Sequence, residues 1–318
     1  AGRASAPAPG GSQMERGDED EEGLERQLEH LIHQSHIRWE DIGGLEDTKQ
    51  EIKMAFALST VEMPQGVTLE GWRGILLYGP PGTGKTLLAA ATSHSLEATF
   101  FNVSLSGILS KYFGESSRLI SALYNVARER APSVVYLDEF EALATQRTGE
   151  ESGAERRVLS TLLSELDGIH TKDHPGYVLT IAASNVPWLL DKAILSRFQS
   201  KILIPLPDPT ARKSILSIIL AGRGITSDWS MDGVVESTEG YSGRELDALV
   251  RSVVNHMVLE ANPDLTKTVD RGLKALKEYK LRVRPLSKHD WKVGLTRLTR
   301  VTTEQDYQVF LNFEKELS

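Results

Sequence analysis

Cysteine is absent from the 318 residues, so the fold contains no disulfide bond and no metal site built on thiolates. No segment approaches the roughly 18 consecutive apolar residues of a membrane-spanning helix, and the N-terminus lacks a basic segment followed by an apolar one. Basic residues are fewer than acidic ones, 36 against 44, which disfavours sequence-independent binding to nucleic acid. These absences predict a cytoplasmic protein with no membrane span and no nucleic-acid partner.

The composition is otherwise that of a globular protein, with 40% hydrophobic and 25% charged residues. Residues 1–22 combine small residues and proline with the acidic stretch "GDEDEE", and we predict that they are disordered. Residues 23–37 are predicted to form a linker helix, because four apolar residues recur there at helical spacing: Leu24, Leu28, Leu31 and Ile32.

From residue 38 onward, short apolar runs alternate with helical patterns. Strands are expected at 74–79, 99–104, 133–138, 177–184 and 201–206, and helices at 47–58, 85–96, 115–130, 153–167 and 191–196. Runs that are apolar along their whole length indicate parallel strands buried on both faces. The pattern therefore predicts an α/β fold in which helices flank a parallel sheet over residues 38–207. A smaller helical lid domain is expected at 208–300 and a closing C-terminal helix at 301–318.

The stretch "GPPGTGKT" follows the first of these strands and opens a helix, which is the context of a phosphate-binding P-loop. Glycines let backbone N–H groups turn inward, and the helix N-terminus adds its positive dipole end. Lys85 is expected to reach the β- and γ-phosphates, and the Thr86 hydroxyl to bind Mg²⁺. The residues assigned to nucleotide binding here are Gly79, Pro80, Pro81, Gly82, Thr83, Gly84, Lys85, Thr86 and Leu87.

Two further strands end in polar residues suited to phosphate chemistry. In "VVYLDEFEAL", Asp138 is expected to hold Mg²⁺, and Glu139 to orient and activate the attacking water. Asn185 ends the strand "TIAASN" and can bind water or the γ-phosphate if its strand lies beside that of Asp138. The alternative is that these residues are ordinary polar strand ends.

These motifs occur in the order found in the classical AAA ATPases, which the chain resembles from about residue 37 to its C-terminus. The segments "IRWEDIGGLEDTKQEI", "LDKAILSRF" and "GYSGREL" are also similar to that family. "KILIPLPD" and the closing segment resemble the meiotic-type branch, which contains katanin, spastin, fidgetin and the ATPase that disassembles ESCRT-III.

The resemblance implies a homo-oligomeric ring, usually a hexamer, with ATP and Mg²⁺ bound between neighbouring subunits. It places Asp41, Ile42 and Gly43 beside the adenine and assigns Arg197 as the arginine finger donated to the next subunit. Relatives often carry a second arginine where this chain has Ser196. The lid motif contributes Gly243 and Arg244, and we hypothesise that Arg244, where relatives usually have a small residue, contacts the γ-phosphate.

The resemblance also assigns "SGILSKYFGES" as a first pore loop, in which Lys111 and Tyr112 grip an extended polypeptide. Residues 148–157 correspond to a second pore loop, and Arg156 and Arg157 begin the helix that follows it. The expected function is ATP-driven threading of a protein chain through the ring, which dismantles a polymeric protein substrate, with an adaptor as a further partner.

Two substrates stay open, an ESCRT-III-like filament and the microtubule. The acidic stretch at 17–22 favours the filament, because tubulin tails are themselves acidic. A proteolytic machine is disfavoured because the chain has no metal motif such as HExxH. A proteasome-docking tail would end in an apolar residue, a tyrosine and one further residue, whereas this chain ends Glu316, Leu317, Ser318. A nucleic-acid ATPase is disfavoured by the acidic composition and by the Lys111–Tyr112 loop. A general unfoldase and a nucleotide-gated scaffold are the remaining alternatives.

Overall fold

The computed structural model describes residues 28–61, 72–111, 115–143, 153–169 and 176–317. Within them, six strands form one sheet in the order β1-β3-β4-β5-β2-β6. Neighbouring strands are parallel, except that β1 is antiparallel to β3. The predicted α/β class is confirmed. The strands are β1 (Ile32–His33), β2 (Gly74–Tyr78), β3 (Thr99–Ser104), β4 (Ser133–Asp138), β5 (Val178–Ser184) and β6 (Ser200–Leu203).

The prediction of a helix over residues 23–37 is wrong in its last part. Ile32 and His33 pair with Phe101 and Phe100 of β3 and form strand β1. The apolar spacing has a tertiary cause, since Leu28 is buried in the core and Leu31 and Ile32 pack against the same core. The spacing of these apolar residues therefore arises from their contact with the edge of the sheet and does not indicate a continuous helix.

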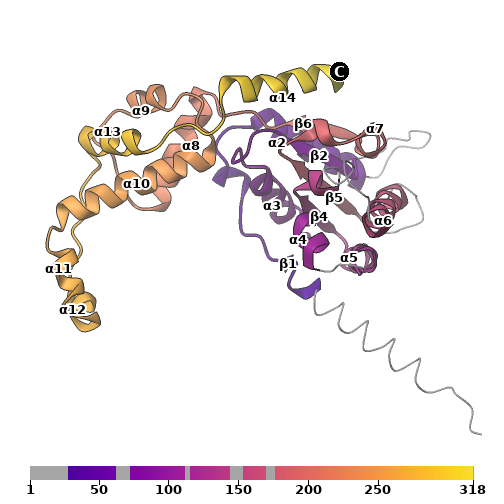
Figure 1. Cartoon of the computed structure of the whole chain (residues 1–318), viewed down its shortest axis with the longest axis horizontal. Coiled ribbons are helices and arrows are strands. Elements are labelled where there is room, and N and C mark those ends of the chain that lie inside the picture. The colour runs from indigo at the N-terminus through magenta and orange to yellow at the C-terminus, as the bar shows by residue number, and fades with distance from the viewer. Residues whose placement is uncertain (1–27, 62–71, 112–114, 144–152, 170–175, 318) are drawn as a thin grey trace, which may run out of the picture.

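The sheet is covered by helices on both faces, as Figure 1 shows. Strand β2 is buried throughout, with Leu76 facing one core cluster and Ile75 and Leu77 facing the other. Helices α2 (Glu46–Thr60) and α3 (Lys85–Ser95) cover one face, whereas α5 (Ser116–Glu129) and α6 (Gly153–Ile169) cover the other. The shorter elements of the sheet domain are η1 (Trp39–Asp41), α4 (Leu105–Lys111), η2 (Phe140–Leu143), η4 (Pro187–Leu189) and α7 (Lys192–Leu195).

The second part of the chain forms a helical lid packed around Trp291, which is fully buried. Its first helix begins sharply, because the Asp208 side chain accepts the N–H of Ala211 and Pro209 occupies the first turn. The lid contains α8 (Pro209–Gly222), α9 (Met231–Ser237), α10 (Gly243–Ala261), α11 (Leu265–Val269), α12 (Leu273–Glu278) and α13 (Lys288–Arg297).

The last helix, α14 (Glu304–Leu317), returns from the lid to the sheet domain (Figure 1). Phe313 meets the ring of Tyr78 edge to face at 5.4 Å, and Phe310 meets Trp188 at 5.1 Å. Tyr78 ends β2 directly before the P-loop, so α14 braces the strand that carries this loop. None of the described helices combines the length and apolar character needed to cross a bilayer.

Candidate functional site

The P-loop connects β2 to α3 through a backbone that requires glycine, as Gly79 and Gly84 illustrate. Gly79 has φ +148°, and a Cβ there would lie 2.2 Å from the carbonyl oxygen of Ile204. Gly84, with φ +101°, stands immediately before the first turn of α3. The loop therefore wraps closely around the N-terminus of α3, where free N–H groups and the helix dipole favour an anion.

Lys85 is folded back over this loop. Its Nζ donates hydrogen bonds to the carbonyl oxygens of Gly79 at 2.8 Å and Pro80 at 2.9 Å, and its side chain is buried. Burial lowers the pKa of Lys85 to about 8, against the opposing effect of the Asp138 and Glu141 carboxylates. The Lys85 ammonium is held at the loop by weak neutral acceptors, which an anionic phosphate oxygen can replace.

Thr86 and Asp138 bring two oxygen donors to the space beside Lys85. The Thr86 hydroxyl lies 2.9 Å from the phenol oxygen of Tyr136, and Asp138 ends the central strand β4. A hydroxyl and a carboxylate are oxygen ligands of the kind that Mg²⁺ prefers, with phosphate oxygens and water completing its shell. The donor set fits the predicted magnesium ion.

Glu139 follows β4 in a left-handed backbone conformation, φ +55°, which is uncommon for a side chain of this size. One oxygen of its carboxylate accepts hydrogen bonds from Ser104, at 3.2 Å, and from Ser106. Asn185 directly follows β5, which pairs with β4, so the condition for its predicted role is met. Its backbone N–H points to Glu141, 3.4 Å from the carboxylate oxygen.

A cavity of about 1070 Å³ lies between the sheet domain and the lid, large enough for a nucleotide. Asp138, Glu139 and Asn185 line it on the sheet side. The other predicted nucleotide-binding residues on its wall are Asp41, Ile42 and Gly43, the loop and helix residues Pro81 to Leu87, and Gly243 with Arg244 of the lid. Gly79 and Pro80 are not among the lining residues, and they contribute through the carbonyl groups that hold Lys85.

The lid closes this cavity through two close contacts with the sheet domain. The backbone N–H of Arg244 donates to the carbonyl oxygen of Gly82 at 3.1 Å. On the opposite side, a Cβ on Gly43 would lie 2.7 Å from the backbone nitrogen of Ile215 in α8. Burial is the main cause of the lowered pKa of Lys85, and the positive charge of Arg244 lowers it further. Two cations therefore face one space. That arrangement attracts a polyanionic ligand.

Arg197 lies outside the cavity. Its Nε is 2.9 Å from a carboxylate oxygen of Asp167 at the end of α6, and both side chains are partly exposed. It is absent from the residues that line the cavity of its own subunit. This position is compatible with the predicted donation of Arg197 to a neighbouring subunit.

Comparison with known proteins identifies the family. The model for "ATPase family associated with various cellular activities (AAA)" matches residues 75–206. The protein SUPPRESSOR OF K(+) TRANSPORT GROWTH DEFECT 1 of Arabidopsis thaliana is 35% identical over 308 residues, covering 88% of this chain and 70% of that protein. The chain belongs to the AAA ATPases. A spastin from Naegleria gruberi is 34% identical, and the match covers 90% of this chain but only 54% of the spastin.

A solved AAA structure shares this architecture. The AAA domain of FIGL-1 in complex with ADP aligns with a TM-score of 0.76 at 27% identity, covering 93% of this chain and 96% of that domain. The chain spans about half the length of the spastin that it matches. Similarity to this AAA ATPase domain therefore extends over both the sheet domain and the lid.

The predicted pore residues of this AAA ATPase are only partly within the described structure. Lys111 is the last residue of α4, a helix that the sequence did not suggest, whereas Tyr112 lies outside the described residues. Of the second predicted pore loop, residues 148–152 also lie outside them, and Arg157 is exposed on α6. The gripping role of Lys111 and Tyr112 stays a prediction.

Three site residues escaped the sequence reasoning: Tyr136, Ser104 and Ser106. The phenol of Tyr136 reaches Thr86, and the two serines bind Glu139. The sequence could have indicated Tyr136. Residues two apart in a strand lie on the same face of the sheet, so Tyr136 shares a face with Asp138. Ser104 could be found only from the sheet register, in which it stands opposite Asp138.

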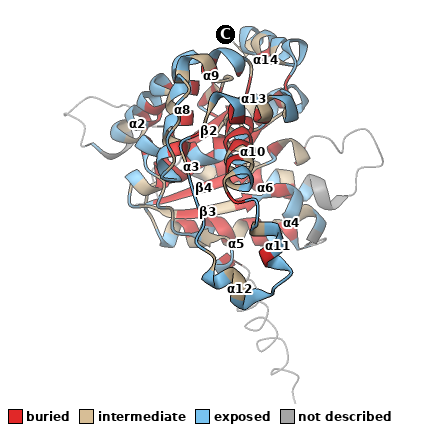
Figure 2. Ribbon diagram, turned by 90° about the vertical axis from the view of Figure 1, so that its left-hand side faces the viewer, coloured by how far each residue is buried: buried red, intermediate tan, exposed pale blue. Residues whose placement is uncertain are grey.

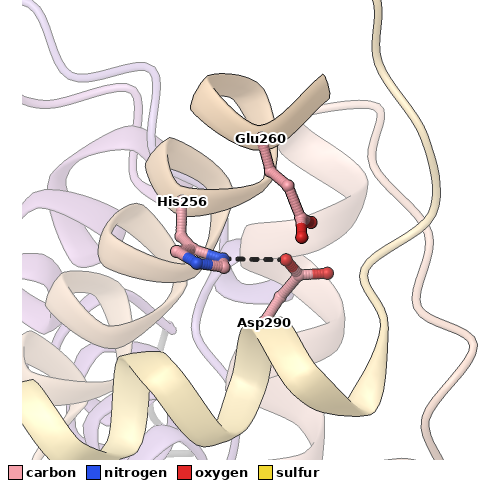
Figure 3. A group of neighbouring side chains, drawn as sticks. All are labelled: His256, Glu260 and Asp290. Atoms are coloured by element: carbon pink, nitrogen blue, oxygen red, sulfur yellow. Dashed lines mark hydrogen bonds and ion pairs between the residues drawn. The ribbon is translucent and has the colours of Figure 1, made fainter. Parts of the chain in front are cut away.

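A second cluster of potential metal ligands lies in the lid, far from the P-loop. His256 and Glu260 of α10 and Asp290 of α13 bring ligand atoms within 4.8 Å of one another (Figure 3). The Arg284 guanidinium bonds to the Asp290 carboxylate at 2.6 and 3.0 Å and to Glu260 as well. A cation is thus already supplied by the chain, and we interpret the cluster as an ionic network that stabilises the lid.

Proposed function

We propose that this chain hydrolyses ATP in the cavity between the sheet domain and the lid. The observation that carries the proposal is the convergence of Lys85, Arg244 and the acidic pair Asp138 and Glu139 on one space beside the P-loop. Two cations and a helix N-terminus attract phosphates, and two carboxylates at a strand end supply a metal ligand and a base.

The residues divide the chemistry among them. Lys85 and the loop N–H groups bind the β- and γ-phosphates, and Thr86 and Asp138 hold Mg²⁺, which neutralises charge on the phosphate oxygens. Glu139 accepts a proton from the attacking water, and Asn185 positions that water or the γ-phosphate. For this step the Glu139 carboxylate must leave the hydroxyl groups of Ser104 and Ser106 and turn toward the cavity.

In this scheme the chain forms a ring, usually a hexamer, and each active site needs an arginine from the neighbouring subunit. The support is the place of Arg197, which pairs with Asp167 outside the cavity of its own subunit. In an assembled ring its guanidinium would meet the γ-phosphate of the neighbouring site and stabilise the charge that develops during transfer.

We further propose that hydrolysis drives threading of a protein segment past Lys111 and Tyr112, which dismantles a polymer. An ESCRT-III-like filament is the favoured substrate, because the acidic residues 18–22 repel the acidic tails of tubulin. Severing of microtubules, in the manner that the resemblance to katanin and spastin suggests, is the second candidate. The supports for both are the family membership and the residues of the predicted pore loop.

The decisive experiment measures phosphate release with and without each polymer. The wild-type chain should be stimulated by its substrate, Tyr112→Ala should lose that stimulation, and Tyr112→Phe should retain it because the aromatic ring is preserved. Glu139→Gln should lower turnover by about 10²- to 10⁴-fold while nucleotide still binds. Normal turnover in Glu139→Gln would refute the proposed hydrolysis mechanism.

The choice of substrate is tested by sedimentation of each polymer with the chain and ATP. We expect the ESCRT-III polymer to shift to the soluble fraction, with the Glu139→Gln variant as the inactive control. ATP-dependent loss of microtubules, with ESCRT-III polymers left intact, would reverse the preference.

A further inference from the structure

The lid carries a projecting arm that the nucleotide chemistry does not use. The lid arm, defined as residues 267–283, contains most of α11, all of α12 and the extended segment that follows. Figure 1 shows α11 and α12 at the end of the lid that lies away from the sheet. Figure 2 shows these helices largely in the colour of exposed residues. The arm is therefore presented to the surroundings.

The charge of the lid arm is opposite to that of the whole chain. The arm has six basic residues and two acidic ones, whereas the chain has a net charge of −8. All six basic side chains are exposed, and Lys267 makes a loose ion pair with Asp264 at 3.7 Å. The basic residues are Lys267, Arg271, Lys274, Lys277, Lys280 and Arg282. Concentrated positive charge on an acidic protein indicates a specific anionic partner rather than a general solubility function.

Large apolar side chains lie exposed among these basic residues. Leu273 is 69% exposed, and Val269, Leu281 and Val283 are each more than half exposed. A single exposed leucine is ordinary, but four aliphatic side chains within one short basic segment are not. The combination of exposed aliphatic and basic side chains is typical of protein surfaces that insert into the headgroup region of a bilayer.

The base of the arm is held in place. The buried side chain of Asn262 bonds both to the backbone N–H of Arg282, at 2.9 Å, and to the carbonyl oxygen of Arg282, at 2.8 Å. Arg284, just beyond the arm, is fixed by the carboxylates of Asp290 and Glu260. The base of the lid arm is therefore fixed from two sides. We infer that the aliphatic side chains of the arm are exposed in the folded lid and not because the arm has unfolded.

We propose that the lid arm docks on a membrane surface that contains anionic lipids. The basic side chains would bind the negative headgroups, and the aliphatic side chains would enter the boundary between headgroups and acyl chains. A nucleic acid would gain more from exposed aromatic residues than from aliphatic ones, and a peptide of acidic residues alone would gain only from the charges. A bilayer is the one partner of the three that uses both features.

This inference goes beyond the proposed function and does not depend on ATP hydrolysis. The arm contributes no residue to the nucleotide cavity. Docking through the arm would place the ATPase domain next to a membrane while the P-loop stays free to bind nucleotide. A failure of membrane binding would leave the proposed hydrolysis untouched, and a failure of hydrolysis would leave membrane binding testable.

The test is co-sedimentation of the full chain, without nucleotide, with vesicles of phosphatidylcholine alone or with part of it replaced by phosphatidylserine. The wild-type chain should bind only the phosphatidylserine vesicles, and binding should weaken as salt is raised. The double variant Lys274→Glu with Lys277→Glu should bind about tenfold more weakly or worse, because two attractive charges become repulsive. Its matched control is Lys292→Glu with Arg297→Glu, which reverses two exposed charges on α13 and should bind like the wild type.

The apolar contribution is tested with Leu273→Ser and Leu281→Ser together. This pair should lower vesicle binding severalfold, while Val301→Ser, at a position 70% exposed outside the arm, should not. Thermal unfolding and basal ATP turnover of each variant establish that it is folded. Competition with polyglutamate and with an oligonucleotide distinguishes the other anionic partners.

Three results would overturn the proposal. The first is failure of the wild-type chain to bind phosphatidylserine vesicles, and the second is unchanged binding in both arm variants. The third is binding of polyglutamate or the oligonucleotide through the arm in the absence of vesicle binding, which would assign the arm to an acidic peptide or to nucleic acid. Loss of vesicle binding confined to the arm variants would support the proposal.

Discussion

Tyr136 places a hydroxyl between the two residues expected to hold magnesium. The ring is fully buried and stacks on Phe100 with centroids 6.3 Å apart, so the phenol oxygen has little freedom to move. That oxygen is 2.9 Å from the hydroxyl of Thr86 and interacts with the carboxylate of Asp138. A rigid phenol can thus restrict the rotamer of Thr86 and hold its oxygen ready for a metal ion.

We expect Tyr136→Phe to weaken the affinity for the Mg²⁺ that binds together with the nucleotide. Loss of one hydrogen bond of about 0.5–1.5 kcal/mol corresponds to a two- to tenfold higher Mg²⁺ concentration for half-maximal binding. A titration of Mg²⁺ against a fluorescent nucleotide measures the shift. Tyr124→Phe is the control, because its hydroxyl is equally buried and bonds to Thr180 outside the cavity. Equal shifts in both variants would contradict a local role for Tyr136.

Arg244 is the second residue whose role can be tested alone. Its backbone is tied to Gly82 of the P-loop, and its charge acts on Lys85. Arg244→Ala should weaken ATP binding by about 10- to 100-fold, the value of a hydrogen bond between charged groups. It should weaken ADP binding much less if the guanidinium contacts the γ-phosphate. Equal losses for ATP and ADP would place Arg244 elsewhere on the nucleotide.

Helices α10 and α13 are joined by a buried carboxylate. Asp290 is fully buried, caps the N-terminus of α13 through Ser287, and contacts Arg284 and His256. Burial alone would raise the pKa of Asp290, but the hydrogen bonds from Arg284, Ser287 and His256 outweigh it and hold the pKa well below its usual value. The lid therefore depends on Asp290 being ionised.

Asp290→Asn should lower the free energy of unfolding of the lid by about 3 kcal/mol at neutral pH, because Arg284 loses its buried partner. The pKa of Asp290 is lower in the folded state than the value of 3.8 expected for the unfolded chain. Its stabilisation is therefore fully present above pH 3.8 and is lost as pH falls below that value.

Urea denaturation of the wild type and of Asp290→Asn across this pH range tests the prediction. The difference in free energy of unfolding between the wild type and Asp290→Asn should be constant above about pH 5 and should shrink as Asp290 becomes protonated. Asp232→Asn, which breaks an exposed ion pair with Lys213, should cost less than about 1 kcal/mol. A difference that persists unchanged into acid would show that packing rather than charge makes Asp290 important.

At the scale of the whole molecule, we propose that the site is completed only when a second subunit donates Arg197. The cavity presents the phosphate loop, the acids and the lid arginine, but Arg197 faces Asp167 outside it. The specific turnover of the wild type should therefore increase with protein concentration as rings assemble. Arg197→Ala should bind nucleotide normally and lose about 10³-fold or more in turnover.

Mixing Arg197→Ala with Glu139→Gln tests donation between subunits. In mixed rings, some sites combine an intact Glu139 with an intact Arg197 from the neighbour, so the mixture should be more active than either variant alone. Arg297→Ala, an exposed arginine in the last turn of α13, is the control and should behave as the wild type. An inactive mixture, together with a concentration-independent wild type, would show that Arg197 does not act between subunits.

The sequence by itself determined the features that depend on neighbouring residues in the chain. Fully apolar runs separated by helical patterns specify a buried parallel sheet, and the glycine spacing before Lys85 specifies a loop that turns at the start of a helix. Such features follow from backbone sterics and hydrogen bonding over a few residues. For that reason the strand positions and the P-loop could be predicted without a structure.

Only the tertiary structure decided which distant side chains meet. The register of β3 and β4 brings Ser104 toward Glu139, the strand order brings Tyr136 beneath Thr86, and Leu28 to Ile32 lie against a sheet edge instead of continuing a helix. The base of the lid arm is likewise fixed by hydrogen bonds between the Asn262 side chain and the backbone of Arg282, 20 residues away. These contacts depend on the packing of the whole chain. The residues around each side chain in the sequence do not indicate which distant residue will become its partner through burial and hydrogen bonding.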